Sequence, residues 1–245
     1  MSMTDLDAIR ECTMTLFDAV PIEPKLDGLV VQHPFTDSII KYNPHTKKMI
    51  DLSKPEDVNE FRNSIEKLVK SNDLSFIFAM INNPWLLTWF KMTNQFMDKK
   101  DFARYLKWSW VQEENPNQDV NVRRREAIKY FRDADKQYLM SSDERVFYNR
   151  LPETVTVYRG VSVGRERLGL SWTNDIGIAE WFKKRFDHGS QHGCILKARI
   201  SKKHVLAYFN ADLREEKELI VDVFAIKDKI EEIETGEHHG TEACT

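Results

Sequence analysis

Residues 154–161 read TVTVYRGV, and residues 193–200 read GCILKARI. Both runs are rich in β-branched residues, which favour strands. Further runs of this kind are LGLSWT at 168–173, HVLAYF at 204–209 and ELIVDVFAI at 218–226. One segment among them, DIGIAEWFKKRF at 175–186, has apolar residues at helical spacing. The sequence after Pro152 therefore predicts an α+β unit with one helix among its strands.

Upstream of Pro152 the apolar residues mostly recur at helical spacing. Helices are predicted over about 1–20, 53–70 (with Ser53 as N-cap), 74–81, 83–96, 101–110, 123–140 and 142–148. Short β-rich runs at about 29–52 predict a small meander. The predicted fold class is thus α+β. A mostly helical N-terminal region with a β meander spans 1–150, and a separate core spans 151–245.

The composition excludes several classes of protein. The chain has 245 residues, 41% of them hydrophobic, and a formal net charge of −3. This balance supplies a core and does not favour bulk binding to nucleic acid. Three scattered cysteines indicate neither a disulfide framework nor a Cys-x-x-Cys metal site. Because the sequence has no signal peptide and no apolar segment long enough to span a membrane, we expect a soluble cytoplasmic protein.

Three groups of polar residues stand in order along the C-terminal part. Arg159 lies near the end of a predicted strand, and Ser171 and Thr173 end the next strand before a helix. Glu216 and Glu218 lie at the entry to the apolar run 219–221. Alternate residues of a strand share one face, so we expect both pairs to point into one cleft.

This ordered set is similar to the R-S-E class of mono-ADP-ribosyltransferases, in which an arginine, a Ser-x-Ser/Thr strand end and a Glu-x-Glu follow one another. The class includes bacterial toxins, phage-encoded enzymes and related defence proteins. The resemblance covers about residues 150–225. It implies a split β-sheet core and NAD as a co-substrate, with no metal. The connection between Arg159 and Ser171 is shorter than the insert usual in the toxins, which predicts a more open cofactor cleft.

The resemblance also implies a role for each residue. Arg159 would bind the pyrophosphate or the adjacent ribose of NAD, since a guanidinium is a planar, permanently charged fork. Ser171 would orient the ribose and the catalytic glutamate, and Thr173 would brace the loop that carries the glutamates. Glu218 would stabilise the positive charge that develops on the ribose as nicotinamide leaves. Glu216 would align the acceptor or assist its deprotonation.

The implied acceptor is a macromolecule. Family members with glutamate at the position of Glu216 tend to modify arginine side chains, so protein arginine is favoured. A nucleic acid acceptor, RNA or DNA, is a second hypothesis. A catalytically silent interaction protein of phage or prophage origin is a third. A toxin or effector would act in the host cytoplasm, away from any membrane, and a neutralising partner protein would accompany it.

Each motif also has a plain structural interpretation. Arg159 alone could be a surface residue of a strand, and Ser171 and Thr173 could cap the helix that starts near Asp175. The glutamates could belong to a solvated charged run. The basic residues at 123–132 are interpreted as a solvated helix face, with contact to a nucleic acid backbone as the alternative. Trp181 is expected to pack between helix and sheet.

Overall fold

The computed structural model describes residues 3–25, 30–43, 47–187, 192–210 and 216–234. Within these residues the fold belongs to the α+β class, as the sequence predicts. The chain divides into two compact units, residues 1–122 and residues 123–245. We call them the N-terminal unit and the C-terminal unit.

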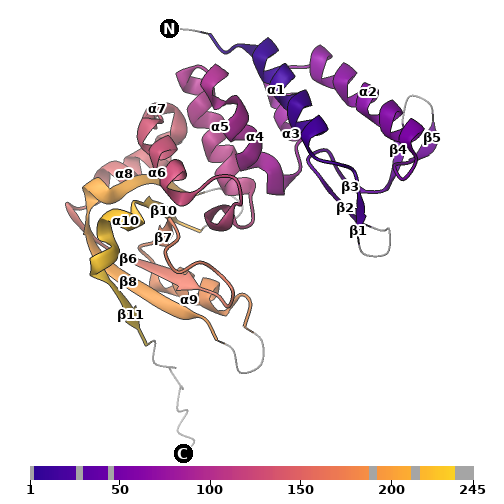
Figure 1. Cartoon of the computed structure of the whole chain (residues 1–245). Coiled ribbons are helices and arrows are strands. Elements are labelled where there is room, and N and C mark those ends of the chain that lie inside the picture. The colour runs from indigo at the N-terminus through magenta and orange to yellow at the C-terminus, as the bar shows by residue number, and fades with distance from the viewer. Residues whose placement is uncertain (1–2, 26–29, 44–46, 188–191, 211–215, 235–245) are drawn as a thin grey trace, which may run out of the picture. The chain divides into compact units, whose positions relative to one another are not determined.

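Helices make up most of the N-terminal unit (Figure 1). They are α1 (Leu6–Ala19), α2 (Pro55–Ser71), α3 (Leu74–Ala79), α4 (Leu86–Thr93) and α5 (Lys99–Gln112). Helix α1 packs against α2 and α4, and α4 packs against α5. Aromatic side chains fill the core, where the ring of Trp89 lies 5.6 Å from Phe78 and 5.9 Å from Tyr105. The Trp89 indole donates a hydrogen bond of 2.9 Å to the Thr13 hydroxyl, so its buried N–H is satisfied.

The meander predicted at 29–52 is present as two small antiparallel sheets. One holds β1 (Pro24–Lys25), β2 (Val30–His33) and β3 (Thr36–Ser38), and the other holds β4 (Ile40–Asn43) and β5 (Lys48–Asp51). The predicted cap at Ser53 is wrong, because Lys54 is the N-cap of α2 and makes no side-chain cap. The Ser53 hydroxyl instead donates to the Asp51 carboxylate at 2.7 Å. Pro55 suits the first helical position, since it has no N–H to leave unpaired.

The C-terminal unit contains a six-stranded antiparallel sheet among its described residues, in the order β11-β8-β6-β7-β10-β9. The strands are β6 (Thr154–Val161), β7 (Ser171–Thr173), β8 (Cys194–Ser201), β9 (Val205–Phe209), β10 (Glu218–Val221) and β11 (Ile230–Ile233). The predicted run at 168–173 is thus shorter than expected. The predicted run at 218–226 ends after Val221, because Asp222 caps the short helix α10 (Val223–Ile226). Strand β11 was not predicted.

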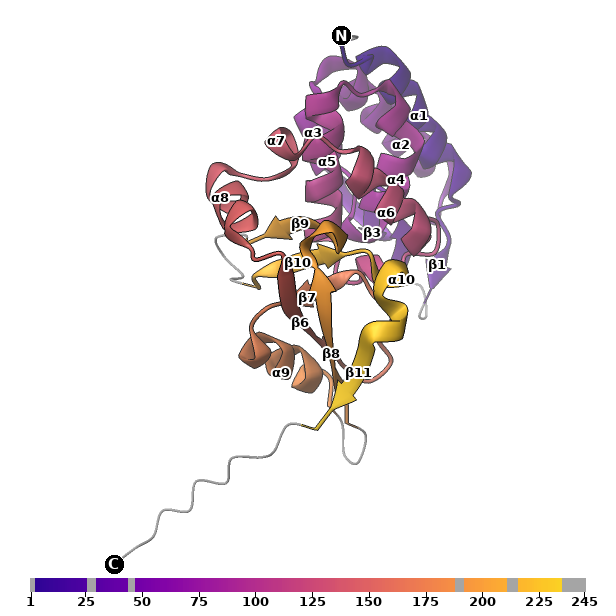
Figure 2. The same cartoon turned by 90° about the vertical axis from the view of Figure 1, so that its left-hand side faces the viewer.

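Helix α9 (Ile176–Lys184) lies against the sheet beside β6 and β8 (Figure 2). The predicted helix at 123–140 is two helices, α6 (Arg124–Asp133) and α7 (Lys136–Leu139). The break falls at Ala134 and Asp135, where the Asp135 side chain accepts from the backbone of Gln137 and caps α7. Helix α8 (Ser142–Arg150) begins with a capping box between Ser141 and Glu144.

Helices α6 to α8 belong to the C-terminal unit. Both α6 and α8 pack against β9. The Tyr148 hydroxyl donates to the backbone carbonyl of Val205 at 3.0 Å, and the backbone N–H of Asn210 donates to the Glu144 carboxylate at 2.9 Å. The two units therefore meet at 122/123, whereas the sequence predicts a division at 150/151. The change from helical spacing to β-branched runs at Pro152 marks the start of the strands and not the start of the unit.

Candidate active site

The adjacent strands β6, β7 and β10 carry most of the residues that the sequence singles out. Arg159 lies on β6, Ser171 and Thr173 lie on β7, and Glu218 is the first residue of β10. Strand β7 pairs with β6 on one side and with β10 on the other. Residues that are far apart in the sequence therefore lie on neighbouring strands.

The register places a carboxylate next to two hydroxyls. Glu218 lies opposite Thr173, and Ile220 lies opposite Ser171. Cross-strand partners of an antiparallel pair point to the same face of the sheet, and so do alternate residues of one strand. The side chains of Glu218, Thr173 and Ser171 therefore share one face. Glu218 and Ser171 are half-buried and Thr173 is buried.

Helix α9 packs on the same face of the sheet. Tyr158 is the β6 residue opposite Thr173, and Gly160 lies two residues further along β6, on the face of Tyr158. A methyl group on Gly160 would lie only 1.9 Å from the backbone oxygen of Ala179 in α9. Helix and strand thus meet at a contact that only glycine allows. Sequence reasoning did not single out Tyr158 or Gly160, since the strand register, which the sequence does not give, is needed to place them.

The guanidinium of Arg159 is enclosed by its own loop. Arg159 is 8% exposed and follows Tyr158, so it points to the opposite face of the sheet. Its Nη1 donates to the carbonyl of Ser171 at 2.6 Å, and its Nη2 donates to the carbonyl of Glu166 at 2.8 Å. A methyl group on Gly169 would lie 2.4 Å from Nη2, so the guanidinium fills the space that this glycine leaves. The resemblance assigns the Arg159 guanidinium to NAD, but in this structure it donates to two backbone carbonyls.

The Arg159 charge is also set by its surroundings. Burial lowers the pKa of Arg159 to about 10, and the carboxylates of Glu218 and Glu166 act in the opposite direction. The side chain therefore remains charged at neutral pH. Its Nε is buried and has no hydrogen-bond partner among the described residues. Arg159 thus contributes positive charge near Glu218 and holds the segment that leads into β7.

The two glutamates do not share a strand. Glu216 lies outside β10, and Lys217 has a backbone φ of 44°, which is the left-handed region. This conformation interrupts the alternation of a strand, so the expectation that Glu216 and Glu218 lie on one strand face is wrong. The Lys217 ammonium instead forms an ion pair of 3.0 Å with Asp175. This contact holds the pKa of Asp175 below its ordinary value.

The N-cap of α9 is Asp175, so the plain alternative that Ser171 and Thr173 cap this helix is wrong. The Thr173 hydroxyl accepts a hydrogen bond of 3.2 Å from the backbone of Asp175, and Asp175 accepts one of 3.0 Å from the backbone of Gly177. Because Lys217 binds the same Asp175, the start of α9 is tied to the segment that precedes Glu218. Sequence reasoning missed this tie, although a lysine between two glutamates was a visible signal.

The chain matches no known family model, no curated protein and no solved structure. In the described part of the chain no helix is long and apolar enough to cross a membrane. A functional assignment therefore depends on the geometry of the residues themselves.

Proposed function

We propose that the C-terminal unit is the catalytic core of an NAD-dependent mono-ADP-ribosyltransferase, with the split sheet of that fold. It transfers one ADP-ribose from NAD to a macromolecule, and protein arginine is the favoured acceptor. The observation that carries the proposal is the register of β7 and β10, with Glu218 opposite Thr173 and Ser171 on the same face. Arg159 on the neighbouring strand β6 supplies the third element.

The chemistry needs a carboxylate close to the ribose. Departure of nicotinamide leaves oxocarbenium character on the sugar, and a fixed negative charge stabilises it. Glu218 is half-buried at the start of β10, where solvent screening is reduced. Ser171 lies diagonally across from Glu218 on the same face and is placed to orient the ribose and the carboxylate.

In this proposal Arg159 is mainly a positioning residue. Its two carbonyl contacts fix the middle of the 162–170 connection, at Glu166, and the first residue of β7, so they help to determine where Ser171 lies. The nearby Glu218 carboxylate in turn stabilises the charged guanidinium, since opposite charges attract one another. The proposed bracing by Thr173 is indirect: its hydroxyl accepts from the backbone of Asp175, and Asp175 pairs with Lys217 beside the glutamates.

The surroundings of the basic helix α6 favour a protein acceptor over a nucleic acid. Arg124 donates to the carbonyl of Leu168 and forms an ion pair of 3.0 Å with Glu166. Arg132 forms an ion pair with Asp222. These contacts occupy two arginines of the basic face within the unit, which leaves fewer charges for a phosphate backbone.

The test is incubation of the full chain with NAD labelled in its adenylate part and a cell lysate. We expect labelled macromolecules that protease destroys and nuclease leaves intact. Glu218→Gln keeps the side-chain shape and removes the charge, so labelling and NAD hydrolysis should fall by about 10²–10³-fold. The matched control is Glu231→Gln on β11, an exposed strand residue, which should keep wild-type activity.

Each other outcome has a distinct meaning. Nuclease-sensitive label would favour a nucleic acid acceptor. Absence of both labelling and NAD hydrolysis in the folded wild-type protein would leave the silent interaction protein as the better hypothesis. A folded Glu218→Gln protein with a tenth or more of wild-type turnover would refute the role of Glu218.

A further inference from the structure

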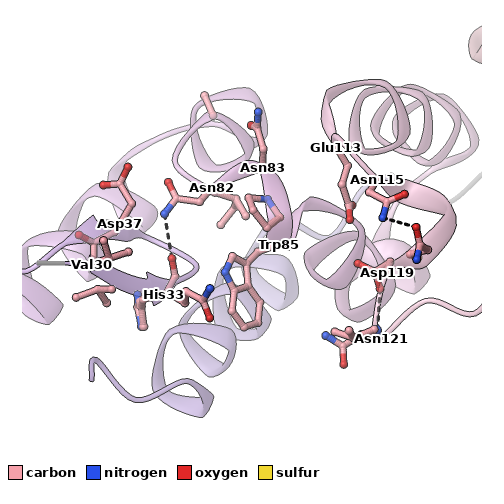
Figure 3. Close-up of a pocket in the computed structure, with 18 residues that line it drawn as sticks. Val30, His33, Asp37, Asn82, Asn83, Trp85, Glu113, Asn115, Asp119 and Asn121 are labelled. Carbon is pink, nitrogen blue, oxygen red and sulfur yellow. Dashed lines mark hydrogen bonds between the residues drawn. The ribbon is translucent and has the colours of Figure 1, made fainter. Parts of the chain in front are cut away.

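The N-terminal unit contains a pocket of about 890 Å³ (Figure 3). This volume falls within the range of pockets that bind small organic ligands. Its walls come from β2 and β3, the segment 79–85 and the segment 113–121. Sequence reasoning assigned nothing to this region beyond a meander and a polar loop.

Two acidic side chains meet in the pocket. Figure 3 shows Glu113 and Asp119 pointing toward one another. Glu113 is 8% exposed, and its Oε2 is buried without a hydrogen-bond partner among the described residues. Asp119 is anchored by the backbone N–H groups of Asn121 and Val122, which both donate to its Oδ1. The Glu113 carboxyl forms hydrogen bonds with Asp119 and with the backbone of Leu87, but its Oε2 is left without a partner in the described part of the chain. A buried oxygen without a donor is costly, so this atom favours a ligand that brings a donor.

No described residue of the pocket wall supplies a compensating positive charge. The lining contains neither lysine nor arginine. His33 lines the wall, but burial holds its pKa below the ordinary value, so it is neutral at physiological pH. Burial, and then the neighbouring Asp119 carboxylate, raise the pKa of Glu113 to about 8. The pocket therefore favours a protonated Glu113 at neutral pH.

The remaining polar groups offer acceptors and a flat ring. Asn82 donates its amide to the His33 carbonyl at 2.9 Å, and Asn115 donates its amide to Gln118 at 2.8 Å. One N–H of each amide is thus used on the protein, and each amide oxygen can accept a hydrogen bond from a ligand donor. The half-buried indole of Trp85 lies in the pocket wall, between the acidic pair and the strand side (Figure 3). An indole face attracts a flat cation.

We propose that this pocket binds a guanidinium group, which donates to Glu113 and Asp119 and stacks on Trp85. A guanidinium presents several N–H donors in one plane and is weakly hydrated, so it enters a partly apolar pocket more readily than an ammonium. A metal ion is a poorer fit. The described residues contain no group of three or more histidine, cysteine, aspartate or glutamate side chains that could hold one. The group could be a free metabolite or the arginine side chain of a protein.

The ligand changes the protonation of the pocket. A bound cation favours the ionised form of Glu113, so the carboxyl must release its proton on binding. Because the pKa of Glu113 without a ligand is about 8, most of one proton should leave at pH 7. At pH 9 the carboxyl is already ionised, and the release should nearly vanish. This behaviour is specific to a cation that contacts Glu113.

The experiment is isothermal titration of the full chain with agmatine at pH 7, in two buffers of different ionisation enthalpy. We expect saturable binding with release of close to one proton. Glu113→Gln should weaken binding at least about 10-fold, since a charged hydrogen bond is replaced by a neutral one. Glu114→Gln is the matched control, because it changes the same charge on the exposed neighbour. Melting temperatures show whether both variants are folded.

Further ligands give the other outcomes. The neutral urea analogue of agmatine should not bind, and 1,5-diaminopentane should bind more weakly. Titration with an N-acetyl-arginine amide distinguishes the sources, since tighter binding than agmatine indicates a protein side chain and weaker binding a free metabolite. No binding of either guanidinium up to about 10 mM, or equal affinity in folded Glu113→Gln, would overturn the proposal. The inference concerns the N-terminal unit and is independent of the transferase activity.

Discussion

Arg159→Lys tests whether this side chain positions the candidate site or grips the dinucleotide. Arginine donates to the carbonyls of Ser171 and Glu166 from two nitrogens at once. The ammonium of lysine is a single point, so it can keep one of these bonds and must leave the other carbonyl without its donor. A charge-assisted bond contributes about 1.5–3 kcal/mol. Because both contacts are only partly buried, we take a loss of about 1.5–2 kcal/mol in the free energy of unfolding.

A loss of this size lowers the melting temperature by about 4–8 °C in a unit of this length. The assay is thermal unfolding followed by circular dichroism, together with titration of NAD by tryptophan fluorescence. The control is Arg167→Lys, since Arg167 is exposed and pairs with Glu232 at the surface, where such pairs contribute little. An unchanged melting temperature in Arg159→Lys would refute the positioning role. Loss of NAD affinity at that unchanged temperature would favour direct contact with the cofactor instead.

Three further predictions follow from the same structure. Glu216→Gln should reduce transfer to the acceptor and spare NAD hydrolysis by water, because water does not need an aligning group; a parallel fall of both rates would contradict that division. Gly160→Ala should destabilise the chain by about 3 kcal/mol or more, since the methyl would meet the backbone of α9 at 1.9 Å, whereas Gly177→Ala should be tolerated. In the folded protein the pKa of Glu113 is raised to about 8 from 4.5, so the free energy of unfolding should fall as pH rises from about 5 to 8. Urea unfolding at several pH values should show a smaller fall in Glu113→Gln.

Periodicity predicted the elements that depend on local sequence. The β-branched run around Arg159 and the amphipathic run before Lys184 formed β6 and α9 near their expected limits. The sequence pattern does not predict strand β11, because Glu231 and Glu232 interrupt its apolar residues. Helix α6 was grouped with the wrong unit, since a helical pattern does not reveal which sheet the helix will cover.

The sequence predicted which residues lie on the strands of the candidate site. It did not predict where their side chains point. The chain order of Arg159, Ser171 and Glu218 agrees with their placement on adjacent strands. The sequence could not show that the guanidinium of Arg159 would be taken by two backbone carbonyls, because these contacts depend on the path of the 162–170 connection. Trp181 was expected between helix and sheet, and it is 56% exposed beside Arg185.

The strand order has a consequence for synthesis. Strand β10 lies inside the sheet, between β7 and β9, although it is made after both. A nascent chain that has not reached Val221 lacks the strand that joins β9 to β7 and the rest of the sheet. Non-local strand pairing also forms slowly. We therefore expect ribosome-bound chains that stop before residue 218 to lack a stable C-terminal unit. They also lack the carboxylate on which the proposed reaction depends, so the site can be complete only after this strand has been released and paired.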